Sequence, residues 1–139
     1  MANIETVSKR ELIMNKERPV NLDLATVKFP ITAIASILHR ICAVITWVGL
    51  GYLLFLLSQA LGSEAQFNAI AESLQTNFFL QFISWGFLAA FSYYCMGTIK
   101  HIIQDLGFFE DLAGGQFISW TAIAAGIILA ILAGVFIWA

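Results

Sequence analysis

The residues best suited to bind a ligand or take part in catalysis lie together near the start of a long apolar stretch. Ser36, His39 and Arg40 are three and four residues apart, so on a helix their side chains project from one face. Placing an arginine inside a membrane helix costs roughly 2.5–3.5 kcal/mol, and less where its side chain reaches an interface. A hydroxyl, an imidazole and a guanidinium on one face therefore indicate a polar pocket just inside the membrane boundary.

A second group of polar residues follows the spacing of one helix face later in the chain. It consists of Tyr94, Gly97, Thr98, His101 and Asp105. Gly97 leaves a gap in side-chain volume where a flat cofactor could approach the backbone. Asp105, four residues after His101, could orient that imidazole. Alternatively, His101 lies near the membrane interface and binds no ligand.

The pocket around Arg40 suits a ligand with oxygen acceptors. A guanidinium and a hydroxyl can hydrogen-bond a carbonyl oxygen that becomes negative on reduction. Quinones carry such oxygens and are apolar enough to arrive through lipid. The same cation can equally pair with a haem propionate, and in a third interpretation Arg40 contacts phospholipid head groups. The residues by themselves therefore favour a quinone or redox-cofactor pocket.

The composition is that of an integral membrane protein. Of 139 residues, 60% are hydrophobic and 12% charged, with a mean hydropathy of +0.83. Soluble domains have about 45–50% apolar and about 25% charged residues. The net charge of -2 gives no indication of a nucleic-acid partner. Cys42 and Cys95 both lie in apolar runs, so neither a disulfide framework nor a CxxC metal site is predicted.

Three apolar segments predict an all-α membrane protein with transmembrane helices at about 35–61, 78–104 and 117–138. A polar N-terminal segment, residues 1–34, approaches the membrane with Pro30 in a first helical turn. It resembles no cleavable signal peptide. Residues 62–77 are predicted to form a loop. Three such helices cover few polar side chains, so we expect them to pack in a bundle with helices of partner subunits.

Basic residues predict the orientation in the membrane. Five of the seven lie in residues 1–28, and the segment between the first two spans has none. The positive-inside rule therefore places the N-terminus in the cytoplasm and the C-terminus outside. We expect a multi-pass protein of a bacterial inner membrane.

The chain resembles a known family of membrane anchors. Residues 18–24 (RPVNLDL) and 29–40 (FPITAIASILHR) resemble the Arg-Pro…Ser-x-x-His-Arg signature of the cytochrome-b-type anchor of succinate dehydrogenase, the larger of its two anchor subunits. Residues 100–107 (KHIIQDLG) are similar to the family's basic-His-x-x-x-Asp-x-Gly element. The resemblance extends from Arg18 to the end of the chain.

This resemblance implies a place in the tricarboxylic acid cycle and in aerobic respiration. In that family a flavoprotein oxidises succinate, an iron–sulfur subunit relays electrons, and two anchors hold the site where ubiquinone is reduced. The anchor is not catalytic alone. Ser36 and Arg40 match the residues that contact the quinone. Leu24, Phe29 and Ile37 lie where apolar walls of that pocket are expected.

The resemblance also implies a b-type haem, but this chain departs from the family's haem-binding pattern. His39 and Arg40 match residues near the haem propionates, and His101 matches a histidine near the haem edge. The family's axial histidine, however, is Tyr94 here, and its glycine has moved from the position of Thr98 to Gly97. Three states stay open: ligation by Tyr94 or a neighbour, a haem held axially only by the partner anchor, or no haem. We expect a bound haem, because the propionate-side residues are kept.

Two other functions are possible interpretations of these residues. The first is a haem-free structural anchor of a succinate dehydrogenase or fumarate reductase complex, with the quinone chemistry supplied by other subunits. The second is a small channel or transporter built by oligomerisation, which is not favoured because the sequence has neither an internal repeat nor a polar stripe across the full bundle.

Overall fold

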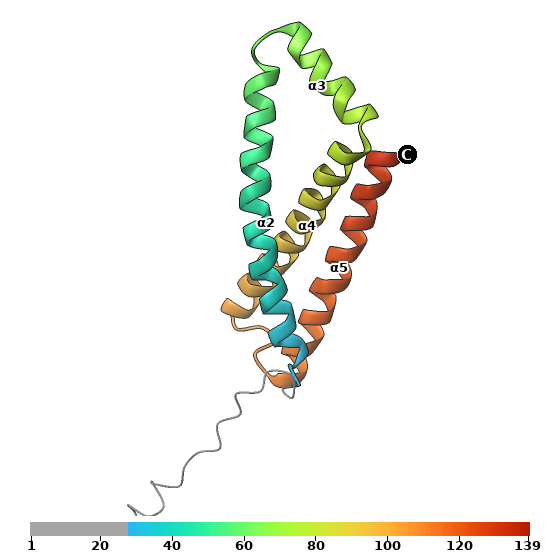
Figure 1. Cartoon of the computed structure of the whole chain (residues 1–139). Coiled ribbons are helices and arrows are strands. Elements are labelled where there is room, and N and C mark those ends of the chain that lie inside the picture. Colours follow the sequence, from blue (N-terminus) through green and yellow to red (C-terminus); the bar gives the residue numbers. More distant parts are fainter. Residues whose placement is uncertain (1–27) are drawn as a thin grey trace, which may run out of the picture.

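The computed structural model describes residues 28–139, which form four helices and no strand (Figure 1). These are α2 (Ile31–Ala60), α3 (Glu64–Thr76), α4 (Phe78–Asp105) and α5 (Leu112–Trp138). The helices α2, α4 and α5 are long and apolar enough to cross a membrane. The predicted all-α membrane fold with three spans is therefore confirmed. Leu24 and most of the segment 1–34 lie outside the described residues.

Two of the long helices begin before the predicted spans. Helix α2 follows Pro30, whose φ of -64° already suits a helix and whose carbonyl accepts from the backbone N–H groups of Ala33 and Ile34. Helix α5 begins at Leu112, because the Asp111 side chain caps it by accepting from the backbone N–H of Gly114 at 3.3 Å. Hydropathy finds the apolar centre of a helix, whereas these caps set its first residue.

The prediction of a loop between the first two spans is wrong. Most of it forms α3, which links the far ends of α2 and α4 (Figure 1). Ser63 caps α3 by accepting from the backbone N–H of Gln66 at 3.2 Å, in the Ser-x-x-Gln pattern of a capping box. Phe67, Ile70 and Leu74 then recur at three and four residues, which is the spacing of an amphipathic helix.

Helix α5 packs mainly on α4. At Gly126 the two helices approach so closely that an added Cβ would lie 2.6 Å from Cδ2 of Tyr93. Farther along, Nε1 of Trp85 donates to the carbonyl oxygen of Ala130 at 3.0 Å. Small residues allow this close contact between backbones. The α4–α5 pair therefore forms the surface on which α2 packs.

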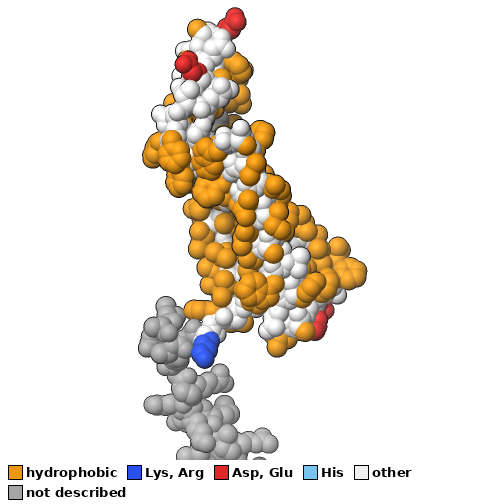
Figure 2. Space-filling model, turned by 90° about the vertical axis from the view of Figure 1, so that its right-hand side faces the viewer, with side chains coloured by type: hydrophobic (Ala, Val, Ile, Leu, Met, Phe, Trp, Pro, Cys, Tyr) orange, Lys and Arg blue, Asp and Glu red, His pale blue; other side chains and the backbone are white. Residues whose placement is uncertain are grey.

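The surface of the described residues is largely apolar. Figure 2 shows a hydrophobic band with acidic side chains at both of its ends. Large side chains such as Trp47 and Phe136 are 73% and 86% exposed. Contiguous apolar surface of this extent needs lipid or partner helices to cover it. Helix α2 crosses α4 near one end and stands apart from it at the α3 end (Figure 1).

Candidate functional site

His39 lies at the centre of the contact between α2 and α4. Its ring stacks on Tyr94 with a centroid distance of 5.0 Å and an interplanar angle of 5°. It lies 5.2 Å from the ring of His101, tilted by 57°. A Cβ added at Gly97 would come within 2.4 Å of Cδ2 of His39. The gap expected at Gly97 therefore exists, but the chain's own imidazole fills it and leaves no room there for a flat cofactor.

Hydrogen bonds fix this arrangement. Nε2 of His39 lies 3.1 Å from Oγ1 of Thr98, and Oγ1 of Thr98 donates to the carbonyl oxygen of Tyr94 at 2.9 Å. The hydroxyl of Tyr93, on α4, donates at 3.0 Å to the carbonyl oxygen of Ala35, which lies one turn before His39 on α2. Residues of two helices thus hold His39 in one orientation.

The predicted quinone ligands lie on α2 next to His39, and their polar groups are unpaired within the described residues. Ser36 is half-buried and Arg40 is exposed. Neither side chain forms a hydrogen bond or an ion pair with another residue of 28–139. Phe29 and Ile37, predicted as apolar walls, are 47% and 45% exposed. This end of α2 therefore presents a cation, a hydroxyl and apolar surface to whatever lies beside it.

Other predicted roles receive less support. Within the described residues, no hydrogen bond joins Asp105 to His101, and Asp105 is exposed. The orienting role expected for this carboxylate is therefore not seen. Two residues contribute hydrogen bonds that the sequence did not predict. Tyr93, as an aromatic side chain in an apolar helix, gave no signal. Thr98 was recognised only as a member of the polar stripe.

The cluster fits the acidic edge of a haem better than its iron. The guanidinium of Arg40 supplies a positive charge that suits propionates, and the imidazole of His101 lies beside the ring of His39. One face of the Tyr94 ring and the adjacent Gly97 surface are covered by His39. This gives Tyr94 a packing role and no support as an iron ligand. No group of three or more His, Cys, Asp or Glu residues that could hold a metal occurs in residues 28–139.

An apolar groove continues from this cluster between α2 and α4. It begins at Val44, about 6 Å along the axis from Arg40, and has a volume of about 590 Å³. Its lining is formed by Val44, Ile45, Val48, Gly49, Tyr52, Phe82, Ile83, Gly86 and Phe87. The hydroxyl of Tyr52 is buried and has no hydrogen-bond partner among the described residues. The groove has the apolar lining typical of sites for hydrophobic ligands.

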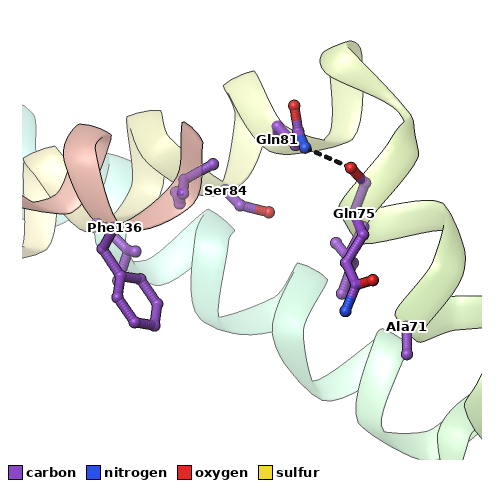
Figure 3. Close-up of a pocket in the computed structure, with 8 residues that line it drawn as sticks. Ala71, Gln75, Gln81, Ser84 and Phe136 are labelled. Carbon is purple, nitrogen blue, oxygen red and sulfur yellow. Dashed lines mark hydrogen bonds between the residues drawn. The ribbon is translucent and has the colours of Figure 1, made fainter. Parts of the chain in front are cut away.

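A second hollow of about 540 Å³ lies near α3, away from His39 (Figure 3). One of its polar side chains is paired within the chain, because Nε2 of Gln81 donates to the backbone carbonyl oxygen of Gln75 at 2.8 Å. Oε1 of Gln81 accepts from Nε1 of Trp138 at 3.1 Å. The described residues that line this hollow include no charged side chain and no histidine, so the first cluster is the better candidate site.

Comparison with known proteins agrees with these observations. Residues 14–138 match the family model of the succinate dehydrogenase/fumarate reductase transmembrane subunit. The chain is also 35% identical to the succinate dehydrogenase cytochrome b556 subunit of Coxiella burnetii over 125 residues, which are 90% of this chain and all of that protein. Both matches include α2, α4 and the His39 cluster. The chain belongs to the family of succinate dehydrogenase/fumarate reductase transmembrane subunits.

Proposed function

We propose that this subunit anchors a succinate dehydrogenase complex in the membrane and contributes Ser36 and Arg40 to its ubiquinone-reduction site. One observation supports this proposal above the others. At the end of a membrane-spanning helix, a hydroxyl and a guanidinium lie near a fixed imidazole, and neither forms a hydrogen bond or an ion pair with another residue of 28–139. A functional site, rather than the fold, accounts for an arginine in this position.

The chemistry of quinone reduction suits these donors. Each carbonyl oxygen of the quinone becomes more negative as electrons arrive, and hydrogen-bond donors already in place stabilise that charge. The guanidinium of Arg40 and the hydroxyl of Ser36 are such donors. The groove that begins at Val44 offers an apolar path for the quinone's prenyl tail. Electrons come from an iron–sulfur subunit, and Ser36 has no carboxylate nearby, so a partner subunit or water supplies protons.

Arg40→Leu in the whole complex tests this function. We expect quinone reduction by succinate to fall at least tenfold, because removing one donor to a developing oxyanion costs about 10²–10³ in rate. Succinate-dependent reduction of a soluble dye, which bypasses the quinone, should be unchanged. Ser36→Ala should act in the same direction, and Trp47→Leu, on the exposed face of α2, is the control. Normal quinone reduction in Arg40→Leu would favour the purely structural anchor.

A b-type haem is the second proposed ligand. The guanidinium of Arg40 and the imidazole of His101 support it, as does the name of the Coxiella burnetii relative, a cytochrome b556 subunit. Arg40 and His101 would hold the propionates, beside the imidazole of His39. When bound, the haem would supply a one-electron redox group. A reduced-minus-oxidised spectrum of the purified complex tests this, and the absence of an α band would refute it.

The remaining proposals concern assembly and orientation. We place the subunit in a bacterial inner membrane with a second anchor subunit, an iron–sulfur subunit and a flavoprotein subunit, with its N-terminus in the cytoplasm. Alkaline phosphatase fused after Ala139 should then be active, since it folds only outside the cytoplasm. Fluorescence from green fluorescent protein fused at the same position, with an inactive phosphatase fusion, would reverse this orientation.

A further inference from the structure

The hydroxyl of Thr98 determines which nitrogen of His39 carries hydrogen. Its oxygen lies 2.9 Å from the carbonyl oxygen of Tyr94 and 3.1 Å from Nε2 of His39. A carbonyl oxygen only accepts, so two oxygens at that distance need the threonine hydrogen between them. Oγ1 of Thr98 can then only accept from His39. Nε2 of His39 is therefore the protonated nitrogen.

The other nitrogen of His39 lies on the edge of the ring away from Gly97. Cδ2 and Cγ of the ring are the atoms nearest to an added Cβ at Gly97, at 2.4 and 3.0 Å. The opposite edge of the ring, formed by Nδ1 and Cε1, consequently faces away from that backbone. Nδ1 forms no hydrogen bond with another residue of 28–139. In the neutral imidazole it is a hydrogen-bond acceptor.

We propose that Thr98 is a positioning residue of the quinone site, which presents Nδ1 of His39 as an acceptor to a hydroxyl of the hydroquinone. This inference rests on the proposed function. A quinone takes up two electrons, relayed from succinate, and two protons from water, and its two carbonyl oxygens become hydroxyl groups. No covalent bond to His39 forms. Arg40 can only donate, so the product's O–H needs a separate acceptor, which Nδ1 supplies.

This acceptor distinguishes the product from the substrate. A quinone has only acceptor oxygens and gains nothing from Nδ1, whereas the hydroquinone donates to it. Without the hydroxyl of Thr98, His39 can exchange its hydrogen between both nitrogens. We therefore expect a change in kcat with little change in KM for the quinone.

The test compares Thr98→Val and Thr98→Ser in the whole complex with ubiquinone as acceptor. Thr98→Val should lower kcat about 3–10-fold, the value of one hydrogen bond, with KM within twofold of the original, and Thr98→Ser should restore it. Thr121→Val is the matched control, because Thr121 makes the same bond to a carbonyl four residues earlier, Phe117, at 3.0 Å, and is exposed on α5. Reduction of a soluble dye by succinate reports assembly and should be unchanged in all variants.

Several results would overturn the inference. One is a normal kcat in Thr98→Val; another is Thr98→Ser behaving like Thr98→Val, which would show that the hydroxyl is not the cause. A third is a further loss when Thr98→Val is added to His39→Gln. Where Thr98→Val does not assemble, Thr98→Ala is measured instead. A normal Thr98→Val beside an inactive Arg40→Leu refutes this inference alone, whereas normal activity in both refutes the proposed function as well.

Discussion

Replacing Gly97 by alanine tests the geometry on which the site depends. The new Cβ would lie 2.4 Å from Cδ2, 3.0 Å from Cγ and 3.3 Å from Cβ of His39. Ordinary contact between carbon atoms needs about 3.5–4.0 Å, so the imidazole must move by roughly 1 Å. That movement lengthens the 3.1 Å contact between Nε2 of His39 and Thr98 beyond hydrogen-bond distance.

The expected cost of Gly97→Ala has two parts. Overpacking costs about 1–3 kcal/mol, and a hydrogen bond between membrane helices contributes about 0.6 kcal/mol. The sum, about 2–4 kcal/mol, should lower the inactivation temperature of the complex and reduce quinone reduction. Gly51→Ala is the control, since nothing lies within 4 Å of its added Cβ in α2. If both variants lose activity at the same temperature and reduce quinone equally well, His39 does not occupy the Gly97 surface and the reasoning fails.

Three further predictions concern other parts of the chain. Tyr93→Phe removes the bond to the carbonyl of Ala35 and should cost about 0.6 kcal/mol, measured as a small decrease in inactivation temperature. Ser63→Ala removes the cap that accepts from Gln66 and should destabilise α3 by about 1 kcal/mol, measured as faster hydrogen exchange confined to that helix. Tyr94→Phe keeps the ring that stacks on His39, so the α band of a bound haem should keep its position and intensity; its loss would identify Tyr94 as a ligand.

The sequence was sufficient for the three spans because the membrane imposes one strong requirement, a long apolar helix. It was insufficient for α3, where hydropathy is low and the signal is a capping box at Ser63 followed by a short amphipathic pattern. The first residues of α2 and α5 were missed for a similar reason. Their caps, Pro30 and Asp111, precede the apolar stretch by which the spans were recognised.

The sequence predicted which residues lie in the candidate site, but not which of them are in contact with one another. Spacing placed Ser36, His39 and Arg40 on one side of a helix, and placed Thr98 on another helix. Spacing within one helix cannot show which side chain crosses to a neighbouring helix. That His39 fills the surface at Gly97 depends on the crossing of α2 and α4, which is a tertiary property.

The crossing of α2 and α4, where His39 packs on Gly97 and Phe87 packs on Gly49, has a mechanical consequence. The far end of α2, at Ala60, is about 30 Å from His39 along the helix axis, and there α2 stands apart from α4 and is connected to it through α3 (Figure 1). A crossing point acts as a pivot, so a change of tilt displaces the distant end most and the crossing least. Variation in bilayer thickness should therefore be absorbed at the α3 end, while the distances around His39 stay nearly constant.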